Sequence, residues 1–165
     1  MKIETNPKWT VCFCVIALLM VLAMCNAASA KEGPSLNNVL FLENYDADTM
    51  TFAYMSSDPF FRDLYENKLK VRLYGIDTPE LKTKSKCEKD LSIKAKEFVR
   101  GQLVRAAEIN LEDCFHGKFA GRVVCSIKYR KRTKWYYLTG ELIKKGYGVA
   151  YFGKKKQKTG DAWCE

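Results

Sequence analysis

Short stretches in which apolar and polar residues alternate predict a β-rich domain. The clearest stretch is 68–76, where Leu69, Val71 and Leu73 alternate with residues suited to an exposed face, as in a half-buried strand. Two earlier stretches flank a polar turn at 44–48 and predict a hairpin. The pattern predicts strands at 39–43, 49–55, 68–76, 109–111 and 122–129, with a short further strand at 135–138.

Helical spacing of apolar residues predicts one long helix after the third strand. Ser85 and Glu88 have the spacing of a capping box at its beginning. A second, brief helix around Leu142 and Ile143 is closed by Gly146. In the long helix the apolar residues are Leu91, Ala95, Phe98, Val99, Leu103 and Ala106. The order β-β-β-α-β-β fits a mainly β protein with helices (α+β), in which five strands form a small OB-type barrel.

The first thirty residues have the layout of an export signal. Residues 11–25 carry no charge, are preceded by lysines and are followed by small residues. We therefore expect residues 1–30 to be a signal peptide cleaved after Ala30, which makes the remainder secreted or periplasmic. An uncleaved membrane anchor over residues 9–30 is the alternative. Both alternatives place the rest of the chain outside the cytoplasm, and only the anchor attaches it to a membrane.

Charge is distributed unevenly along the 165-residue chain, which has a formal net charge of +9. Residues 31–81 hold 5 basic and 9 acidic side chains (net −4), whereas residues 82–165 hold 21 and 9 (net +12). A carboxylate cluster beside a basic surface favours polyanions such as nucleic acid. The alternative is that the basic residues form an ordinary solvent-exposed face, which would give the same distribution of charge. The single histidine, His116, excludes a Cys2His2 zinc finger and an HExxH metalloprotease.

Cysteine usage agrees with export. An even number of cysteines lies beyond residue 30, and in an oxidising compartment such cysteines form disulfides. They are Cys87, Cys114, Cys125 and Cys164. Their spacing does not fit a zinc site. Three pairings are possible, and we favour the one that joins Cys87 to Cys164 and so ties the C-terminal tail to the body of the domain.

The segment 71–80 concentrates residues suited to phosphate chemistry. Arg72 lies on a strand and Asp77 follows five residues later, so strict alternation would put the two side chains on opposite faces. A bulge at Gly75 would return Asp77 to the face of Arg72. The proline after Thr78 favours extended backbone there, which fixes the direction of the Thr78 carbonyl.

These residues predict a metal-assisted phosphodiesterase site. Oxygens of Asp48, Asp77 and Thr78 suit calcium, which tolerates backbone carbonyls and flexible geometry. Glu80 would take a proton from an attacking water molecule. Two arginines would offset the charge that develops on the phosphoryl oxygens. They are Arg72 and Arg122.

Three patches of the sequence resemble the staphylococcal-nuclease-like (thermonuclease) family: residues 46–49, 72–80 and 118–122. The resemblance extends over about residues 38–164, which we take as the nuclease domain. It implies an OB-fold, calcium-dependent endonuclease that hydrolyses DNA and RNA and leaves 3′-phosphates. We expect the enzyme to act as a monomer.

The resemblance also implies roles for individual positions. The three calcium ligands, the general base and the two phosphate-binding arginines are Asp48, Asp77, Thr78, Glu80, Arg72 and Arg122. Asp46 would hold the calcium ligands in place without binding the ion. Lys118 and Tyr151 resemble positions that contact the nucleotide and its terminal phosphate. Ala47 stands where the family has a glycine, which predicts strain if the turn requires positive φ.

Two other functions remain open. A noncatalytic nucleic-acid-binding module of the same fold would bind a polynucleotide without cleaving it. A membrane-tethered interaction protein would dock on acidic partners through its basic face. Calcium-dependent cleavage of single-stranded DNA separates the enzyme from both alternatives.

Overall fold

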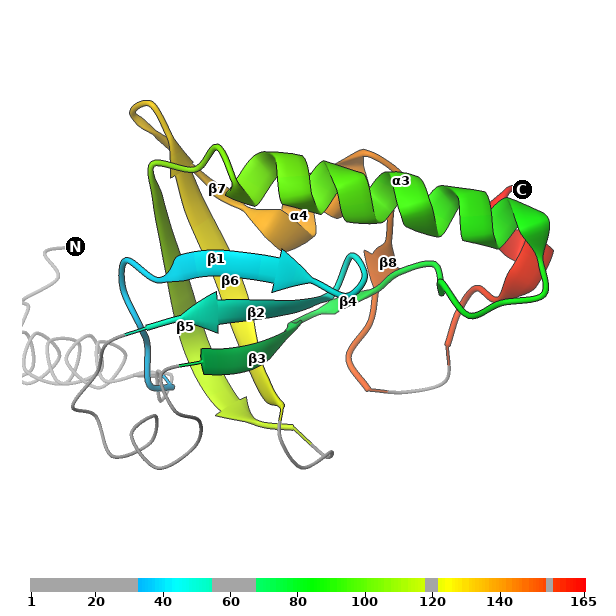
Figure 1. The fold of residues 1–165 in the computed structure, drawn as a ribbon. Coiled ribbons are helices and arrows are strands. Elements are labelled where there is room, and N and C mark those ends of the chain that lie inside the picture. Colours follow the sequence, from blue (N-terminus) through cyan, green and yellow to red (C-terminus); the bar gives the residue numbers. More distant parts are fainter. Residues whose placement is uncertain (1–32, 55–67, 118–121, 154–155) are drawn as a thin grey trace, which may run out of the picture. The chain divides into compact units, whose positions relative to one another are not determined.

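The computed structural model describes residues 33–54, 68–117, 122–153 and 156–165 (Figure 1). Within these ranges the chain forms eight strands, two α-helices and one 3-10 helix, which confirms the predicted mainly β protein with helices. The elements are β1 (Leu40–Asn44), β2 (Thr49–Ala53), β3 (Lys68–Leu73), β4 (Ile76–Asp77), α3 (Lys86–Leu103), β5 (Glu108–His116), β6 (Val123–Lys131), β7 (Lys134–Tyr137), α4 (Leu138–Lys144), β8 (Val149–Ala150) and the 3-10 helix η1 (Gly160–Trp163).

One mixed sheet makes up most of the domain. Its strands run in the order β1-β2-β3-β6-β5, and β7 pairs with β6. Neighbouring strands are antiparallel except β3 and β6, which are parallel. β4 and β8 form a separate two-stranded antiparallel sheet. The six-stranded sheet therefore carries the body of the domain, and the small sheet lies at the end of β3 (Figure 1).

This sheet is not closed into the predicted five-stranded barrel. Among the described residues no ladder joins β1 to β5, and an isolated bridge between Leu36 and Leu111 links the segment before β1 to β5 instead. The long helix α3 also follows β4, not the third strand. The reason is that the strand predicted over 68–76 is broken by a turn into β3 and β4.

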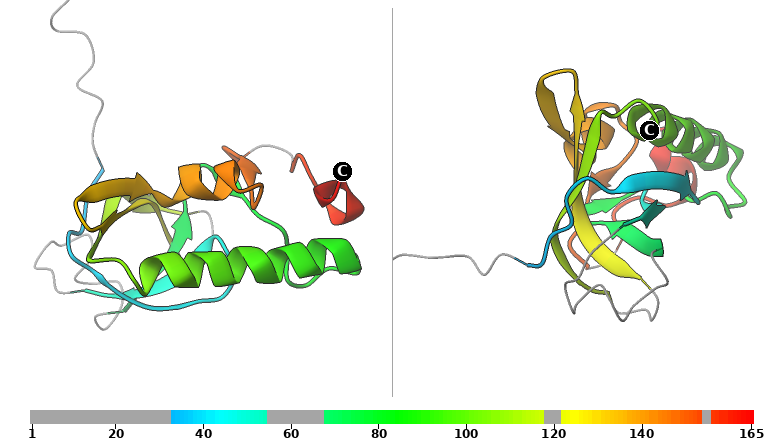
Figure 2. Two further views of the ribbon diagram at one scale, coloured as in Figure 1. Left: turned by 90° about the horizontal axis from the view of Figure 1, so that it is seen from above. Right: turned by 60° about the vertical axis from the view of Figure 1, so that its left-hand side comes forward.

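The hydrophobic core lies against the inner face of the sheet. On β3 the side chains of Leu69, Val71 and Leu73 are buried, whereas the residues between them are exposed or half-buried. β6 repeats this alternation along its length. Helix α3 lies along β1, and α4 lies against β6 and β7 (Figure 2). The predicted period-two pattern therefore identifies the buried face of the sheet correctly.

The beginning of α3 is joined to two distant segments. Oγ of Ser85 accepts a hydrogen bond from the N–H of Glu88 at 3.1 Å, as an N-cap residue does. The second half of the predicted capping box is wrong, because the N–H of Ser85 donates to Oγ1 of Thr83 at 3.2 Å. The carboxylate of Glu88 instead accepts from the N–H of Glu80 at 3.1 Å and of Gly160 at 3.0 Å. Glu88 therefore connects α3 to the loop after β4 and to η1.

Two disulfides cross-link the domain. Cys87 pairs with Cys164, which confirms the favoured pairing and fixes the C-terminal end beside the beginning of α3 (Figure 1). Cys114 pairs with Cys125 and links β5 to β6. The four cysteines beyond residue 30 are thus all in disulfides.

Some predicted features fall outside the described residues. They are the signal peptide or anchor within residues 1–30 and the turn that carries Lys118. In the ranges that the structure does describe, no helix has the length and apolar character needed to cross a membrane.

Candidate active site

The turn between β1 and β2 is shaped by Asp46. Its Oδ1 atom accepts hydrogen bonds from the N–H groups of Asp48 at 3.1 Å and Thr49 at 2.7 Å, which is an Asx-type turn. Ala47 is buried in this turn and its φ is not positive, so the predicted strain at Ala47 is wrong. The turn places Asp48 immediately before β2, with its side chain buried in the domain.

The carboxylate of Asp48 is buried and hydrogen-bonded through both oxygens. Oδ1 accepts from the Thr49 hydroxyl at 3.1 Å and from the Arg72 guanidinium, and Oδ2 accepts from the Thr78 hydroxyl at 2.8 Å. Burial raises the pKa of Asp48 to about 7, and the nearby Arg72 opposes this rise. A further positive charge at this position would stabilise the ionised carboxylate.

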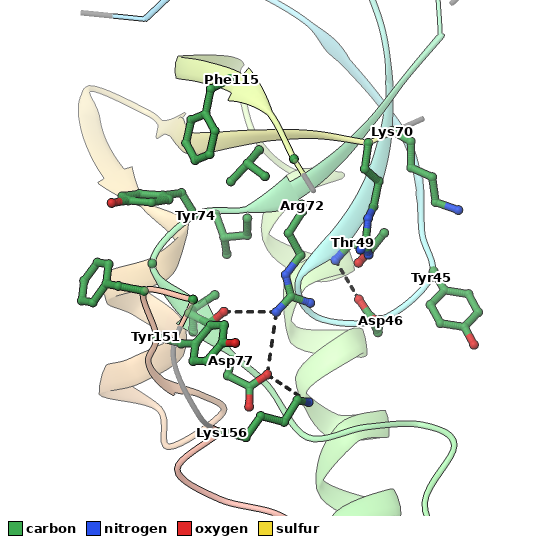
Figure 3. A pocket seen from close by; sticks show the side chains of 18 of the residues that line it. Tyr45, Asp46, Thr49, Lys70, Arg72, Tyr74, Asp77, Phe115, Tyr151 and Lys156 are labelled. Atoms are coloured by element: carbon green, nitrogen blue, oxygen red, sulfur yellow. Dashed lines mark hydrogen bonds and ion pairs between the residues drawn. The ribbon is translucent and has the colours of Figure 1, made fainter. Parts of the chain in front are cut away.

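Arg72 joins the two aspartates predicted to bind calcium. It lies on β3, which pairs with both β2 and β6 and is therefore held in the middle of the sheet. Its guanidinium contacts Asp48. It also lies 3.7 Å from Oδ1 of Asp77 and donates to the carbonyl of Ile76 at 3.3 Å (Figure 3). Arg72, Asp48 and Asp77 thus form one cluster.

A turn at Gly75, and not the predicted bulge, brings Asp77 beside Arg72. β3 ends two residues before Gly75, and β4 begins at the residue after it. Gly75 has φ +76°, a left-handed conformation that is costly for residues with a Cβ atom. Its carbonyl accepts from the N–H of Tyr151 at 3.0 Å, so the segment after β8 is held against the turn.

Lys156 is a site residue that the sequence analysis missed. Its ammonium group lies 3.2 Å from Oδ1 of Asp77 (Figure 3). It also lies 2.6 Å from Oε1 of Glu80. Burial lowers the pKa of Lys156, but these two carboxylates outweigh that effect and raise the pKa above its usual value. In the sequence this lysine belongs to a basic run, which is usually a solvated tail.

Asp77 provides the observation that tests whether a cation fits here. Its side chain is buried, and among the described residues its Oδ2 atom has no hydrogen-bond partner. A buried carboxylate oxygen is normally paired. The carboxylates of Asp48 and Asp77 and the carbonyl of Thr78 offer the hard oxygen donors that calcium prefers. The donor set therefore fits calcium.

The protein would supply only part of the coordination shell. Among the residues that the structure describes, no three His, Cys, Asp or Glu side chains gather as a metal-binding group. Calcium takes about six to eight oxygen ligands. Water and the phosphate oxygens of a substrate would have to complete the set.

A pocket of about 910 Å³ lies beside this cluster (Figure 3). Six predicted site residues line it: Asp46, Arg72, Asp77, Glu80, Arg122 and Tyr151. Asp48 and Thr78 are buried and do not line it. Lys118 lies outside the described residues. The structure therefore brings the two arginines and Glu80 to one cavity although fifty positions separate Arg72 from Arg122 in the sequence.

Glu80 is the exposed carboxylate of the site. Its side chain is 52% exposed, in contrast to the buried Asp48 and Asp77. Its backbone is fixed by the hydrogen bond from its N–H to Glu88 on α3. Glu80 thus combines a fixed position with access to water, which a general base for hydrolysis requires.

A β-rich domain whose pocket combines arginines, lysines and carboxylates is the arrangement expected of a protein that handles nucleic acid. The family model described as staphylococcal nuclease homologue matches residues 70–163, more than half of the chain. The chain therefore belongs to the staphylococcal nuclease homologue family. A comparison with curated proteins gives no match. The matched range begins after Asp46 and Asp48, so their assignment rests on the contacts described above.

Proposed function

We propose that this chain is a calcium-dependent endonuclease that hydrolyses phosphodiester bonds in DNA and RNA and leaves 3′-phosphate products. The observation that carries the proposal is a single pocket lined by Arg72, Arg122, Glu80 and Asp77. Membership of the staphylococcal nuclease homologue family supports a nucleic-acid-related function. Paired cations and a water-accessible carboxylate are the groups that this hydrolysis uses.

Each of three side chains has one task in the proposed reaction. Arg72 and Arg122 bind the non-bridging phosphate oxygens and offset the charge that develops on them. Glu80 accepts a proton from a water molecule while the water oxygen forms its bond to phosphorus. The bond from phosphorus to the 5′ oxygen breaks, and the leaving oxygen takes up a proton from solvent.

Asp48, Asp77 and the carbonyl of Thr78 are proposed to hold the calcium ion. When bound, calcium neutralises charge on the phosphate and polarises its oxygens. The unpartnered Oδ2 of Asp77, within the described part of the chain, supports this assignment. Asp46 keeps Asp48 in position through its two hydrogen bonds to the turn and is not itself a ligand.

Two further residues are proposed to contact the nucleotide. Tyr151 lines the pocket beside the arginines, where its ring is available to a sugar or a base. Lys118 is proposed to hold a terminal phosphate. This assignment comes from the sequence resemblance.

The sheet is proposed to be a partly open OB barrel. β1 and β5 are the two ends of the strand order β1-β2-β3-β6-β5. The Leu36–Leu111 bridge, and the hydrogen bond from the N–H of Val39 to the carbonyl of Ile109 at 2.9 Å, lie where such a barrel would close.

Export is also proposed, with residues 1–30 as the signal peptide. The two disulfides support it, because disulfides persist in oxidising compartments. An anchor over residues 9–30 would instead give a membrane-bound protein with the nuclease domain outside. N-terminal sequencing of the exported protein distinguishes cleavage after Ala30 from an intact N-terminus.

A second candidate function has one observation in its favour. Lys156 pairs with Asp77 and Glu80, so cations of the chain itself already neutralise the carboxylates of the site. A module that only binds nucleic acid would need no metal and no general base. Such a module would bind polynucleotides equally well with calcium or with a chelator and would form no product.

The test is an endonuclease assay on single-stranded DNA and on RNA, with calcium or with a chelator. Glu80→Gln and Arg122→Ala are expected to lower the calcium-dependent rate by about 100-fold or more, since each removes one catalytic interaction. The matched controls are Glu97→Gln on α3 and Arg130→Ala on β6, neither of which lines the pocket. Binding without cleavage by the unaltered protein would overturn the proposal.

A further inference from the structure

Basic side chains gather where the turn between β6 and β7 meets the end of α3. We call Arg105, Lys131, Arg132 and Lys134 the basic tip. Lys131 is half-buried and the other three residues are exposed. Burial and the neighbouring Arg105 lower the pKa of Lys131, against the opposing effect of Glu141. The turn projects from the end of the sheet that lies away from β4 and β8 (Figure 1).

The basic tip holds positive charge that its own surroundings do not neutralise. Within the described part of the chain, the side chains of Arg105, Arg132 and Lys134 form no ion pair and no hydrogen bond. Arg130, the neighbouring outward-facing residue of β6, is instead paired with Glu108 at 3.0 Å. Exposed cations gathered in this way create a positive potential that attracts anions. The basic tip is therefore suited to a negatively charged partner.

Two backbone features show that the arginines of the basic tip occupy unfavourable positions. Arg132 has φ +53° in the two-residue turn between β6 and β7, where asparagine or glycine is the usual choice. The Arg105 guanidinium lies over Gly101 of α3, where a Cβ atom would come within 3.1 Å of Nη2. A glycine inside a helix weakens that helix. Neither choice helps folding, which favours a binding role for both arginines.

Strand β6 leads from the pocket to the basic tip. Val124 lines the pocket, and every second residue after it faces outward, while the residues between them are buried. From Val124 to Arg132 the chain covers roughly 27 Å at the usual rise of a strand. On this outer face Lys128 and Arg130 are each paired with a glutamate of β5. The cations without an acidic partner therefore lie at the far end of the face that begins in the pocket.

We propose that the basic tip binds the phosphate backbone of a polynucleotide at a distance from the bond that is cleaved. The proposal rests on the proposed function for its ligand, a strand that occupies the pocket. Any polyanion would be attracted by the charge, but the outer face of β6 gives a strand that leaves the pocket a direct path to the basic tip. Contacts with phosphates carry no sequence information and weaken as salt is added. The basic tip thereby favours long strands over short ones.

The experiment measures binding in a chelator, where no hydrolysis interferes. Fluorescence anisotropy at several salt concentrations compares a dinucleotide with a single strand longer than the roughly 16 nucleotides that one OB fold covers. The triple variant combines Arg105→Gln, Arg132→Asn and Lys134→Gln, and asparagine accepts the left-handed conformation of Arg132. It is expected to bind the long strand about tenfold more weakly. The slope of log K against log salt concentration is expected to fall by about 2, at about 0.7 for each phosphate contact.

The dinucleotide is expected to bind the triple variant and the unaltered protein equally, because it is too short to reach the basic tip. The matched control replaces three exposed lysines of α3 that do not line the pocket, as Lys86→Gln, Lys89→Gln and Lys94→Gln. It is expected to leave the salt slope unchanged. An equal loss in this control would show an effect of net charge alone and would overturn the proposal. Equal losses on the dinucleotide and the long strand would also overturn it.

A single variant guards against misfolding of the triple variant, which circular dichroism detects. Arg132→Asn alone is expected to lower the salt slope for the long strand by about 0.7. An unchanged slope in a folded Arg132→Asn protein would overturn the contact at this residue.

Two further measurements separate this proposal from its competitors. Loss of binding to phosphatidylglycerol vesicles, with unchanged affinity for the long strand, would make the basic tip a membrane-binding surface and overturn the proposal. A protein that binds the long strand through the basic tip but never hydrolyses it with calcium retains this site and loses the nuclease assignment. A triple variant that hydrolyses the long strand with unaltered KM retains the nuclease assignment and loses the basic tip.

Discussion

The ammonium group of Lys156 lies between Asp77, a proposed calcium ligand, and Glu80, the proposed general base. It lies 3.2 Å from Asp77 and 2.6 Å from Glu80. A calcium ion bound to Asp77 would lie near this ammonium group, and like charges about 4 Å apart repel by about 4 kcal/mol near a protein surface. Lys156 is therefore a competitor of the proposed calcium ion, and the free protein is neutralised at this position before the ion arrives.

Lys156→Met is accordingly expected to tighten calcium binding by about tenfold, which corresponds to about 1.4 kcal/mol. Isothermal titration calorimetry with calcium on the free protein measures the effect without relying on turnover. Lys158→Met is the matched control, because it removes the same charge from the same tail and does not line the pocket. An unchanged or weaker affinity in Lys156→Met would show that the lysine does not compete with the ion.

Local sequence patterns could predict the proximity of residues that lie close together in the sequence. Arg72 and Asp77 are five positions apart, and a local break at Gly75 was enough to join them, although the break is a turn and not a bulge. Lys156 lies 79 positions after Asp77, within a run of lysines that carries no local signal of a partner. Its position depends on how β8 and η1 pack, which local patterns do not determine.

At the scale of elements, α3 supports the loop that carries Glu80. The buried carboxylate of Glu88 accepts one hydrogen bond from the loop that carries Glu80 and another from Gly160 of η1. Ser85, which caps the same helix, also donates to Asp161 of η1 at 2.5 Å. The first turn of α3 thus fixes Glu80 and the C-terminal end of the chain at the same time.

Glu88→Ala is expected to lower the free energy of unfolding by about 1 kcal/mol, because two partly buried N–H groups lose their acceptor. The rate of hydrolysis is expected to fall as well, since Glu80 loses its backbone support. Urea denaturation and the nuclease assay measure the two effects. Glu97→Ala, on the exposed face of the same helix, is expected to leave both unchanged. A stable Glu88→Ala protein with full activity would contradict the supporting role.

Strands and helices with strong periodicity were predicted, and the two-residue strands were not. The alternation of Leu69, Val71 and Leu73 identified the buried face of β3, and the spacing in α3 identified the helix. The two-residue strands β4 and β8 have no period to detect and exist because they pair with each other. β5 extends to His116, well beyond the predicted 109–111, because β6 provides a partner along its length.

At the scale of the whole molecule, the site depends on the disulfide between Cys87 and Cys164. The segment that carries Lys156 runs between β8 and η1, and η1 is held at α3 by the Cys87–Cys164 disulfide. This disulfide joins residues 77 positions apart, and the loop that it closes contains the described elements from β5 to η1 together with Arg122. Closing so long a loop removes much of the conformational entropy of the unfolded chain.

Replacing both residues of this disulfide, as Cys87→Ala with Cys164→Ala, is expected to lower the free energy of unfolding by about 4 kcal/mol, the entropy expected for a loop of this length. Glu80 and Lys156 both lie near the freed end, so the tenfold effect of Lys156→Met on calcium affinity is expected to shrink in this background. Urea denaturation and calcium titration of the double and triple variants provide the two measurements. If the lysine effect were undiminished without the disulfide, the packing of η1 through Glu88 and Ser85 alone would suffice to hold Lys156 in the site.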